Sequence, residues 1–571
     1  MSVEKLITDH IDIWSSAVQT RSTAGRGSNG KIDLYGIKKL RELILELAVR
    51  GKLVPQDPND EPASELLKRI AAEKAELVKQ GKIKKQKPLP EISEDEKPFE
   101  LPVGWEWVRL GFITNYGECD KAEPTDADAD TWIVELEDIE KSTSRLLNRV
   151  TFSERPFKSS KNKFNKNDVL YGKLRPYLDK VLVADYSGVC TTEIIPIKVY
   201  GNILPGYLRL LLKSPRFIAY ANESTHGMNL PRLGTDKAIN AVVELTAIAE
   251  QSRIVNKVDE LMSLCDQLEQ QYLTSLDAHQ QLVETLLTTL TDSQNAEELA
   301  ENWARIYQHF DTLFITEVSI DALKQTILQL AVLGKLVPQD PNDEPASELL
   351  KRIEQEKAQL VKEGKIKKQK PLPPISEDEK PFELPKGWEW CRIGSVINIR
   401  AELVKPENYY NFFQVAPDII EKGTGKVISQ RTVKESGIKG PNSRFYKNQI
   451  VYSKIRPSLS KAFIAEYDGL CSADMYPLDC FINTGYLLKV ILSEVFLIQV
   501  RAAENRIKMP KLNVESLSNI LIPVPPAGMQ SAVFSKISQM DTFCDTLKSH
   551  LQSAQQIQLN LADTLTDATV N

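Results

Sequence analysis

The sequence predicts an α+β protein built as two related halves, in which two mixed α/β domains are joined by long helices that form an antiparallel coiled coil. The first observation is a 57-residue segment that occurs twice, at 51–107 and 334–390, with 51 identical positions. The second is that two diverged segments follow these copies. The third is heptad spacing of apolar residues at the end of each half. An internal pseudo-two-fold is therefore expected to relate the halves.

The bulk composition is typical of a globular protein with more than one core. The 571 residues exceed the size of a single core, and 42% are apolar and 26% charged. No stretch approaches ~18 uninterrupted apolar residues, which argues against a transmembrane helix, and the N-terminus lacks a signal-peptide pattern. The seven cysteines form no C-x-x-C pair, which fits a reduced cytosol better than disulfides or a zinc module. A cytoplasmic location is expected.

The repeated frame predicts two helices and a linker. Each half opens with apolar residues at helical spacing, which begin at Leu40 and Leu323. The stretch VPQDPNDEP has three prolines, which exclude a regular helix. Ser64 and Ser347 are the expected N-caps of a second helix, which ends near Gly81 in the first half. The polar linker that leads to the GWEW motif is expected to be extended and to run over the surface.

The segments that follow the GWEW motifs are diverged but can still be aligned at an offset of 281 positions. The runs VLY, VLVADY and IIPI, bounded by Gly, Pro and Asn, predict strands. The matched Tyr171 and Tyr452 lie in apolar triplets, which favours core positions over stacking positions. Two mixed α/β domains with a common fold and different surfaces are expected. The predicted order is a helical region and linker at 1–107, a domain at 108–245, a central region at 246–390, a domain at 391–525 and a helix at 526–571.

The apolar residues that close each half predict one long helix per half with a coiled-coil seam. The two helices are the economical partners for each other. Each is expected to span ~35–40 residues, or ~50–60 Å at ~1.5 Å per residue, and to act as a rigid spacer between the α/β domains. The predicted seam residues are Val258, Leu261, Leu268, Ile537, Met540 and Leu547.

Matched parts of the diverged domains are strongly basic, although the whole chain has a net charge of −6. Residues 141–180 carry a net charge of +8 and residues 422–461 a net charge of +9. One basic segment is usually a solvated face, but two in register favour a polyanion-binding surface. In each Lys-x-Arg-Pro motif the two basic side chains are expected to project to one side of an extended strand. The candidate DNA-binding residues are Lys158, Lys161, Lys163, Lys173, Arg175, Lys180, Lys439, Arg444, Lys447, Lys454, Arg456 and Lys461.

Catalytic motifs are mostly absent from the sequence. The string GTGKV at 423–427 lacks the first glycine and the Ser or Thr of a phosphate-binding loop. The Asn/Asp-Pro-Pro-Tyr/Phe tetrapeptide of amino-methylating enzymes does not occur. The string EDIEK at 137–141 loosely resembles the acid-x-lysine element of nucleases, but such strings are common by chance. No catalytic residue and no metal site are expected.

The order of these features resembles the specificity subunit of type I restriction–modification enzymes over essentially the whole chain. The resemblance rests on the GWEW motif and on the segments DVLYGKLRPYLDKV, IPVPPAGMQ and AEQSRIVNKVDELMSLCDQLE. The frame AVRGKLVPQDPNDEPASELL is most similar to the IB subfamily. In this family two target recognition domains each read one half of a split DNA sequence, and conserved helices separate them.

The resemblance implies a non-catalytic, DNA-binding subunit of a host-defence restriction system, which reads a bipartite asymmetric target. Residues 108–245 and 391–525 would be its target recognition domains. Two methyltransferase subunits and two motor-nuclease subunits are the implied partners. S-adenosylmethionine, ATP and Mg are expected on those partners, and no cofactor is expected on this chain. The alternatives are a protein-binding repeat scaffold and a single-chain nuclease–methyltransferase.

The chain departs from the family pattern just before its long helices. The proline-rich element is intact at 522–530 but reads VVELTAIAEQ at 242–251. The family's Glu-Gln pair is kept in the first half, whereas the second half has Met-Gln. The missing prolines leave open how the chain leaves the first α/β domain.

Overall fold

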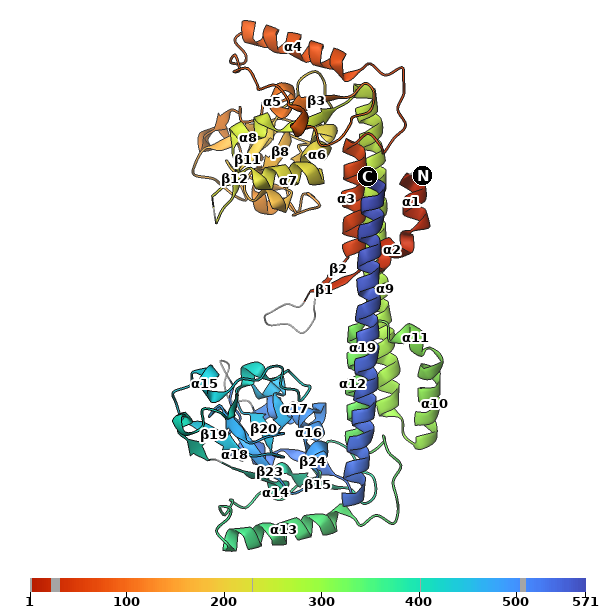
Figure 1. The fold of residues 1–571 in the computed structure, drawn as a ribbon, viewed down its shortest axis with the longest axis vertical. Coiled ribbons are helices and arrows are strands. Elements are labelled where there is room, and N and C mark those ends of the chain that lie inside the picture. Colours follow the sequence, from red (N-terminus) through yellow and green to blue (C-terminus); the bar gives the residue numbers. More distant parts are fainter. Residues whose placement is uncertain (1–2, 22–30, 228, 401, 504–509, 571) are drawn as a thin grey trace. The chain divides into compact units, whose positions relative to one another are not determined.

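The computed structural model describes residues 3–570 except 22–30, 228, 401 and 504–509. The chain divides into two compact units, one of Met1–Ser275 with Ala554–Asn571 and the other of Leu276–Ser553. Each unit combines helices with small sheets (Figure 1), which confirms the predicted α+β class. Within the described ranges, every helix is too short or too polar to cross a membrane.

The first unit contains a helical frame and one mixed α/β domain. Its helices are α1 (Val3–Asp9), α2 (Ile11–Ser16), α3 (Tyr35–Val49), α4 (Ala63–Lys79), α5 (Leu110–Ile113), α6 (Pro205–Lys213), α7 (Pro215–Glu223), α8 (Thr235–Asn240), the first part of α9 (Ile248–Asp292) and the last part of α19 (Ala527–Val570). Its strands are β1 (Gln19–Arg21), β2 (Lys31–Asp33), β3 (Glu106–Arg109), β4 (Lys121–Ala122), β5 (Trp132–Val134), β6 (Val150–Thr151), β7 (Lys161–Phe164), β8 (Val169–Gly172), β9 (Val181–Val183), β10 (Gly188–Cys190), β11 (Ile194–Ile197), β12 (Thr225–His226), β13 (Arg232–Leu233) and β14 (Val242–Leu245).

The second unit repeats this plan with the remaining parts of α9 and α19. Its other helices are α10 (Ala296–Gln308), α11 (Phe310–Leu313), α12 (Glu317–Val332), α13 (Ala346–Lys362), α14 (Ile393–Val396), α15 (Val433–Ser436), α16 (Thr484–Leu492), α17 (Glu494–Ala503) and α18 (Val514–Asn519). Its strands are β15 (Glu389–Arg392), β16 (Ile397–Ile399), β17 (Leu403–Val404), β18 (Phe413–Val415), β19 (Asn442–Phe445), β20 (Ile450–Ser453), β21 (Ala462–Ile464), β22 (Gly469–Cys471), β23 (Met475–Cys480) and β24 (Leu521–Val524).

The two α/β domains share a sheet topology despite their divergence. One sheet has the order β4-β7-β10-β5-β6 in the first domain and β17-β19-β22-β18 in the second. The other sheet has the orders β11-β8-β9 and β16-β23-β20-β21. The predicted strands VLY and IIPI correspond to β8 and β11, whereas VLVADY is a strand only over its first three residues, β9. Tyr171 and Tyr452 are 3% and 1% exposed, which confirms that they are core residues.

The first and last strands of each α/β domain pair with each other. β3 is antiparallel to β14, and β15 is antiparallel to β24. β14 forms this pair without the proline that β24 contains, Pro523, so the chain leaves both domains in the same way. A matched glutamine then ties each long helix to its domain. The side-chain oxygen of Gln251 accepts from Leu204 N–H at 3.0 Å, and that of Gln530 accepts from Asn483 N–H at 2.8 Å.

The first tryptophan of each GWEW motif is buried beside the start of a long helix. Trp105 Nε1 donates to Glu250 Oε2 at 2.9 Å. In the second unit Met529 stands at the place of Glu250, and Trp388 Nε1 donates to Gln339 Oε1 at 2.8 Å, as Trp105 also does to the matched Gln56 at 3.3 Å. The indole N–H is therefore satisfied in both halves despite the substitution.

α4 and α13 are the second helix that the sequence predicts in each frame copy. The prediction that Ser64 and Ser347 are their N-caps is wrong, because each helix begins at the alanine before the serine and has a proline as its N-cap. The first N–H of α4, from Ala63, donates to the carbonyl of Gly104 at 2.8 Å, which satisfies one of the N–H groups at this end of the helix. Gly81, with φ of 68°, directly follows the C-cap residue of α4, as expected.

α9 and α19 are 45 and 44 residues long, which exceeds the expected length and corresponds to ~65 Å at ~1.5 Å per residue. Each unit holds the beginning of one helix and the end of the other, as antiparallel helices require. A third helix joins them in each unit, α3 in the first and α12 in the second. The seam that the sequence predicts between two helices is therefore part of a larger bundle.

The predicted seam residues belong to three different cores. The cluster that contains α3 buries two of them, and the second α/β domain buries one. The other three are partly buried at the edges of the clusters that contain α3 and α12. Val258 and Leu261 are buried in the cluster that contains α3, and Leu268 lies at its edge. Ile537 is buried in the second α/β domain. Met540 and Leu547 lie at the edge of the cluster that contains α12.

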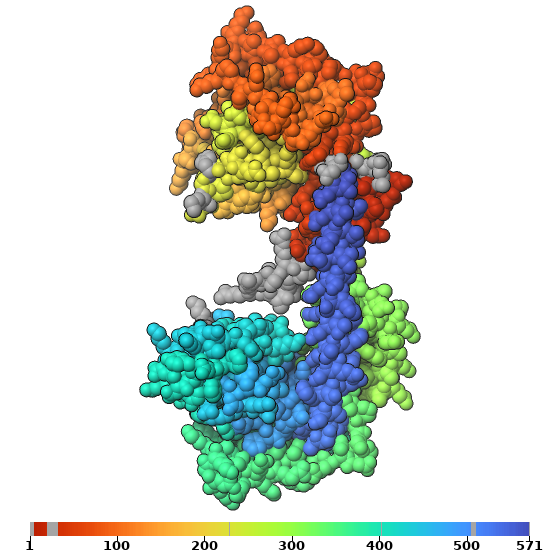
Figure 2. Space-filling view, viewed as in Figure 1, coloured from red at the N-terminus to blue at the C-terminus, as the bar shows by residue number. Residues whose placement is uncertain are grey.

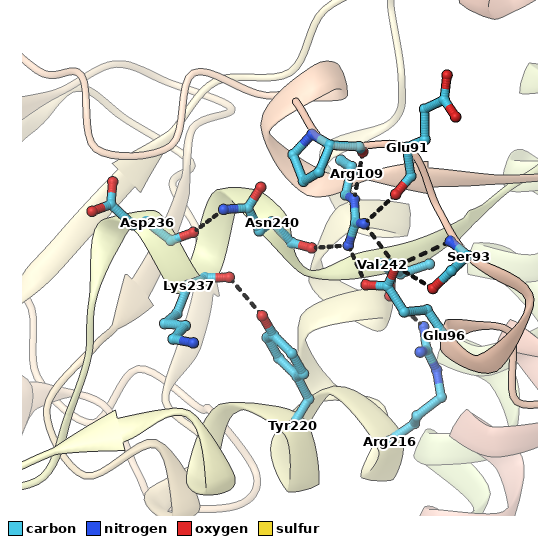
Figure 3. Close-up of polar contacts among 11 residues, drawn as sticks. Glu91, Ser93, Glu96, Arg109, Arg216, Tyr220, Asp236, Lys237, Asn240 and Val242 are labelled. Atoms are coloured by element: carbon cyan, nitrogen blue, oxygen red, sulfur yellow. Dashed lines mark hydrogen bonds and ion pairs between the residues drawn. The ribbon is translucent and has the colours of Figure 1, made fainter. Parts of the chain in front are cut away.

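A buried arginine pins the linker to the α/β domain (Figure 3). Arg109 donates to both carboxylate oxygens of Glu96 at 2.6 and 2.8 Å, and to the carbonyls of Glu91 and Asn240 at 2.9 and 2.7 Å. Ser93 N–H donates to the same carboxylate at 3.1 Å. The bonds from Arg109 and Ser93 lower the pKa of Glu96 to about 2. The linker thus lies on the surface of its unit, within the part that is orange in Figure 2, and Arg109 attaches it to the α/β domain.

The second unit contains the same attachment. Arg392 donates to both carboxylate oxygens of Glu379 at 2.9 and 3.1 Å and to the carbonyl of Asn519 at 2.8 Å. An arginine has five N–H donors in a rigid plane, which suits a carboxylate and several carbonyls at once. The two repeated linkers are therefore held by the same chemistry.

We expect Arg109→Lys to lower the free energy of unfolding by about 2 kcal/mol, because one ammonium group cannot serve the carboxylate and the carbonyls together. Urea unfolding should show a lower midpoint, and limited proteolysis should show faster cleavage in the linker. Arg352→Lys is the control, since Arg352 forms an exposed ion pair with Glu344 at 2.6 Å and should change neither result. An unchanged midpoint for Arg109→Lys would contradict the assigned role.

Candidate nucleic-acid interface

The Lys-x-Arg-Pro motif forms a turn in both α/β domains. β8 and β20 end just before it, and short 3-10 helices, Pro176–Leu178 and Pro457–Leu459, begin at its proline. Arg175 and Arg456 have φ values of 53° and 45°, in the left-handed region. A residue before proline avoids the right-handed helical conformation, and a left-handed arginine is uncommon. The prediction that the lysine and arginine project from one side of an extended strand is therefore wrong.

Backbone hydrogen bonds hold this turn against a segment that comes later in the chain. Arg175 N–H donates to the carbonyl of Pro231 at 2.7 Å, and Arg456 N–H donates to that of Pro510 at 2.9 Å. A leucine N–H in the same later segment donates to the carbonyl of the motif's lysine, at 3.0 and 2.8 Å in the two domains. The backbone thus fixes the turn, while both arginine side chains are exposed.

The later segment carries a basic residue that pairs with an acidic residue near the turn. Arg232 binds the carboxylate of Glu193 at 2.9 to 3.1 Å, and Lys511 lies 3.2 Å from that of Asp474. The hydrogen bond from Arg232 lowers the pKa of Glu193. Sequence reasoning missed this segment because its contact with the motif is long-range. The only available signal was the basic residue at comparable places in both halves.

The structure separates the candidate DNA-binding residues into three groups. Six of them are exposed: Lys158, Lys163, Arg175, Lys439, Lys447 and Arg456. Lys173 and Lys454 are half-buried next to the turn, and Lys454 Nζ lies 5.1 Å from the centre of the Tyr476 ring. The remaining four make contacts inside their own domains.

Two of these four residues, both lysines, support the fold at matched positions. Lys180 Nζ donates to the carbonyl of Leu136 at 2.6 Å, and Lys461 Nζ donates to that of Pro417. Partial burial lowers the pKa of both ammonium groups. Their hydrogen bonds join the end of the basic turn to a neighbouring loop, so their side chains are engaged before any ligand arrives.

The other two internal cations are held by charge and by aromatic rings. Lys161 pairs with Glu135, and its side chain is 13% exposed. The Arg444 guanidinium lies 4.7 Å from the centre of the Tyr446 ring and near the carboxylate of Glu402, at 3.8 Å. These contacts explain part of the basic excess in the sequence as internal packing.

Comparisons with known proteins agree with this architecture. A family model described as the type I restriction modification DNA specificity domain matches residues 385–558. Over the full length of both chains, the protein is 48% identical to the type I restriction enzyme EcoAI specificity subunit of Escherichia coli and 50% identical to the EcoEI specificity subunit of the same species. The chain belongs to the type I restriction enzyme specificity subunits. As such it is a non-catalytic subunit whose function is to recognise DNA sequence.

A solved structure supports the fold of this specificity subunit. That structure was solved to explain the structural basis underlying complex assembly and conformational transition of the type I R-M system. It aligns with a TM-score of 0.50 at 16% identity, over 83% of this chain and 99% of that one. At this level of identity the likeness concerns the fold alone.

The acidic string at 137–141 has an internal role in the specificity subunit. The Asp138 carboxylate is buried and accepts from Arg155 at 2.7 and 2.9 Å and from Glu135 N–H at 2.8 Å. In the second domain Asp418 pairs with Arg431 at 3.1 Å. Among the described residues, no group of three or more His, Cys, Asp or Glu side chains is placed to hold a metal ion.

A buried ion pair supports the basic turn in the first domain only. Lys213 Nζ donates to Asp179 Oδ2 at 2.5 Å and to Ser144 Oγ at 2.9 Å. Burial raises the pKa of Asp179 to about 6, although Lys213 opposes the shift. At the matched positions the second domain has Ser460 and Leu492. The two domains therefore close the same turn with different chemistry.

Lys213→Leu should lower the free energy of unfolding by about 3 kcal/mol, because it leaves a buried carboxylate without its partner. The double variant Asp179→Ser/Lys213→Leu, which copies the second domain, should recover most of this loss. The raised pKa of Asp179 sets the sign of the pH effect. The single variant should be least destabilised below about pH 6, where Asp179 is protonated, and most destabilised above it. Equal losses at pH 5 and pH 8 in urea unfolding would contradict this assignment.

Proposed function

We propose that the specificity subunit reads a split DNA target, with one half-site bound at each basic turn. The observation that carries this proposal is the pair of left-handed arginines, Arg175 and Arg456, at matched places in two diverged domains. Strained residues recur where function requires a defined side-chain position. A fixed turn that presents an exposed arginine suits recognition of a phosphate or of a guanine edge.

The charge distribution supports binding to DNA at these turns. Each turn lies in a segment whose net charge is +8 or +9, although the whole chain has a net charge of −6. Exposed lysines such as Lys158 and Lys439 belong to the same segments and suit contacts with phosphate oxygens. The turn would then add position and specificity to this general attraction.

The near-identical frame suits two copies of one protein partner. The repeated linkers and the helices α4 and α13 present almost the same residues in both units. We infer that these surfaces dock two methyltransferase subunits and that two motor-nuclease subunits complete the enzyme in the cytoplasm. S-adenosylmethionine, ATP and Mg would bind to those partners.

The assembled complex should methylate a bipartite, non-palindromic sequence, because the two domains have different surfaces. Single-molecule sequencing of host DNA would reveal the methylated adenines together with both half-sites and the gap between them. A continuous or palindromic motif would contradict one half-site per domain. Binding of radiolabelled S-adenosylmethionine by the isolated chain would instead favour a single-chain methyltransferase.

Arg456→Asn should weaken binding of the complex to its target duplex by roughly tenfold or more, since asparagine tolerates the left-handed backbone but removes the guanidinium. Fluorescence anisotropy at matched salt would measure this change, and gel filtration would check assembly. Arg501→Asn is the control in the same domain, because Arg501 is paired with Glu494 on the exposed side of α17. Unchanged affinity for Arg456→Asn would remove this turn from the interface.

A further inference from the structure

The first α/β domain has an open groove that the basic turn does not use. Its volume is about 860 Å³, and the ends of β5, β7 and β10 line it. The side chains that matter here are Trp132, Arg149 and Tyr186 on the wall, with Lys163 and Asp130 also among the lining residues. The groove therefore offers aromatic, cationic and anionic groups within one site.

Arg149 is held in this groove by three neighbours. Its guanidinium carbon lies 4.3 Å from the centre of the Trp132 ring and 5.0 Å from that of Tyr186. One of its terminal nitrogens donates to the carboxylate of Asp185, and this bond lowers the pKa of Asp185. The Arg149 side chain nevertheless remains 40% exposed. Its plane and direction are thus set while part of its edge faces the solvent.

The second domain lacks this arrangement at the matched positions. Phe413 and Tyr467 occupy the places of Trp132 and Tyr186, and their ring centres are 4.7 Å apart. The strand register equates Arg149 with Gln430, because β5 pairs with β6 as Phe413 pairs with Thr432. Without an arginine at this place, the two rings of the second domain contact each other directly. The cation is therefore a distinctive feature of the domain that would read one of the two half-sites.

We propose that Arg149 is a specificity-determining residue that reads a guanine in the half-site bound by the first domain. This inference rests on the proposed DNA-reading function of that domain. A guanidinium forms two parallel hydrogen bonds with guanine O6 and N7 in the major groove. Stacking on Trp132 and the bond to Asp185 fix the group before DNA arrives, so less conformational freedom is lost on binding.

The acidic side of the groove agrees with this assignment. The cytosine paired with that guanine presents its N4 amino group as a donor in the major groove, and carboxylates accept from it. Asp130 is exposed and lines the same groove as Arg149. Guanine presents two adjacent acceptors to the guanidinium and its cytosine presents a donor to the carboxylate, whereas adenine presents only the N7 acceptor beside its N6 donor.

The test uses the complete complex and its sequenced methylation motif. Arg149→Lys keeps the positive charge but removes the planar guanidinium. The methylation motif should then tolerate other base pairs at a single G·C position of one half-site, with discrimination against those base pairs lowered roughly tenfold or more. The other half-site should stay unchanged. Gln430→Lys at the matched place in the second domain is the control and should leave that position intact. An unchanged motif for Arg149→Lys, or a motif with no G·C pair in either half-site, would overturn the proposal.

A second measurement alters the DNA and compares the wild-type complex with the same variant. Each guanine of the target duplex is replaced in turn by 7-deazaguanine, which lacks the N7 acceptor. Anisotropy should show a loss of affinity for the wild-type complex at the guanine whose position Arg149→Lys relaxes, and a smaller loss there for Arg149→Lys. Equal losses in both proteins would assign that guanine to another residue and overturn the proposal. The proposed function itself fails if the wild-type complex shows a continuous or palindromic target.

Discussion

The pairing of the first and last strands of each α/β domain is the constraint on which the rest of the structure depends. β3 with β14, and β15 with β24, bring the two ends of an insertion together beside the start of a long helix. Once these ends are joined, the chain between them can change without disturbing the helical frame. The buried arginines Arg109 and Arg392 strengthen the same point, because each binds the linker and the end of a short helix at once. A repeated frame with diverged inserts follows directly from this arrangement.

Within the inserts, backbone geometry is shared and side-chain chemistry differs. The left-handed residues Asn167 and Asn448 recur at matched places, as do the two arginines of the basic turns. The buried ion pair that supports the first turn does not recur, since Asp179 is replaced by a serine. The same contrast holds at the groove of Arg149. A scaffold that fixes the backbone and varies the side chains is well suited to presenting two different reading surfaces.

Local charge is more informative than net charge in this protein, but only after internal pairs are set aside. The chain is acidic overall, and its two basic segments are evident only in the alignment of the halves. Lys180 and Lys461 contribute to the count, although they donate to backbone carbonyls in their own domains. Exposed residues such as Lys158 and Lys439 remain as the electrostatic surface. The positive charge available to DNA is therefore smaller than the net charge of the two basic segments, and it lies on fewer residues.

The sequence by itself determined what depends on local order: the repeat, the long helices, strands such as β8, the buried Tyr171 and Tyr452, and the family. These follow from periodicity and from residue type, which act over a few neighbours. Only the tertiary structure decided the left-handed turn at the Lys-x-Arg-Pro motif, the third helix in each bundle and the stack around Arg149. Each of these depends on partners far along the chain, such as Pro231 for Arg175 and Tyr186 for Arg149. Long-range contacts of this kind leave no local sequence pattern, because neither residue of such a pair is unusual among its neighbours in the sequence.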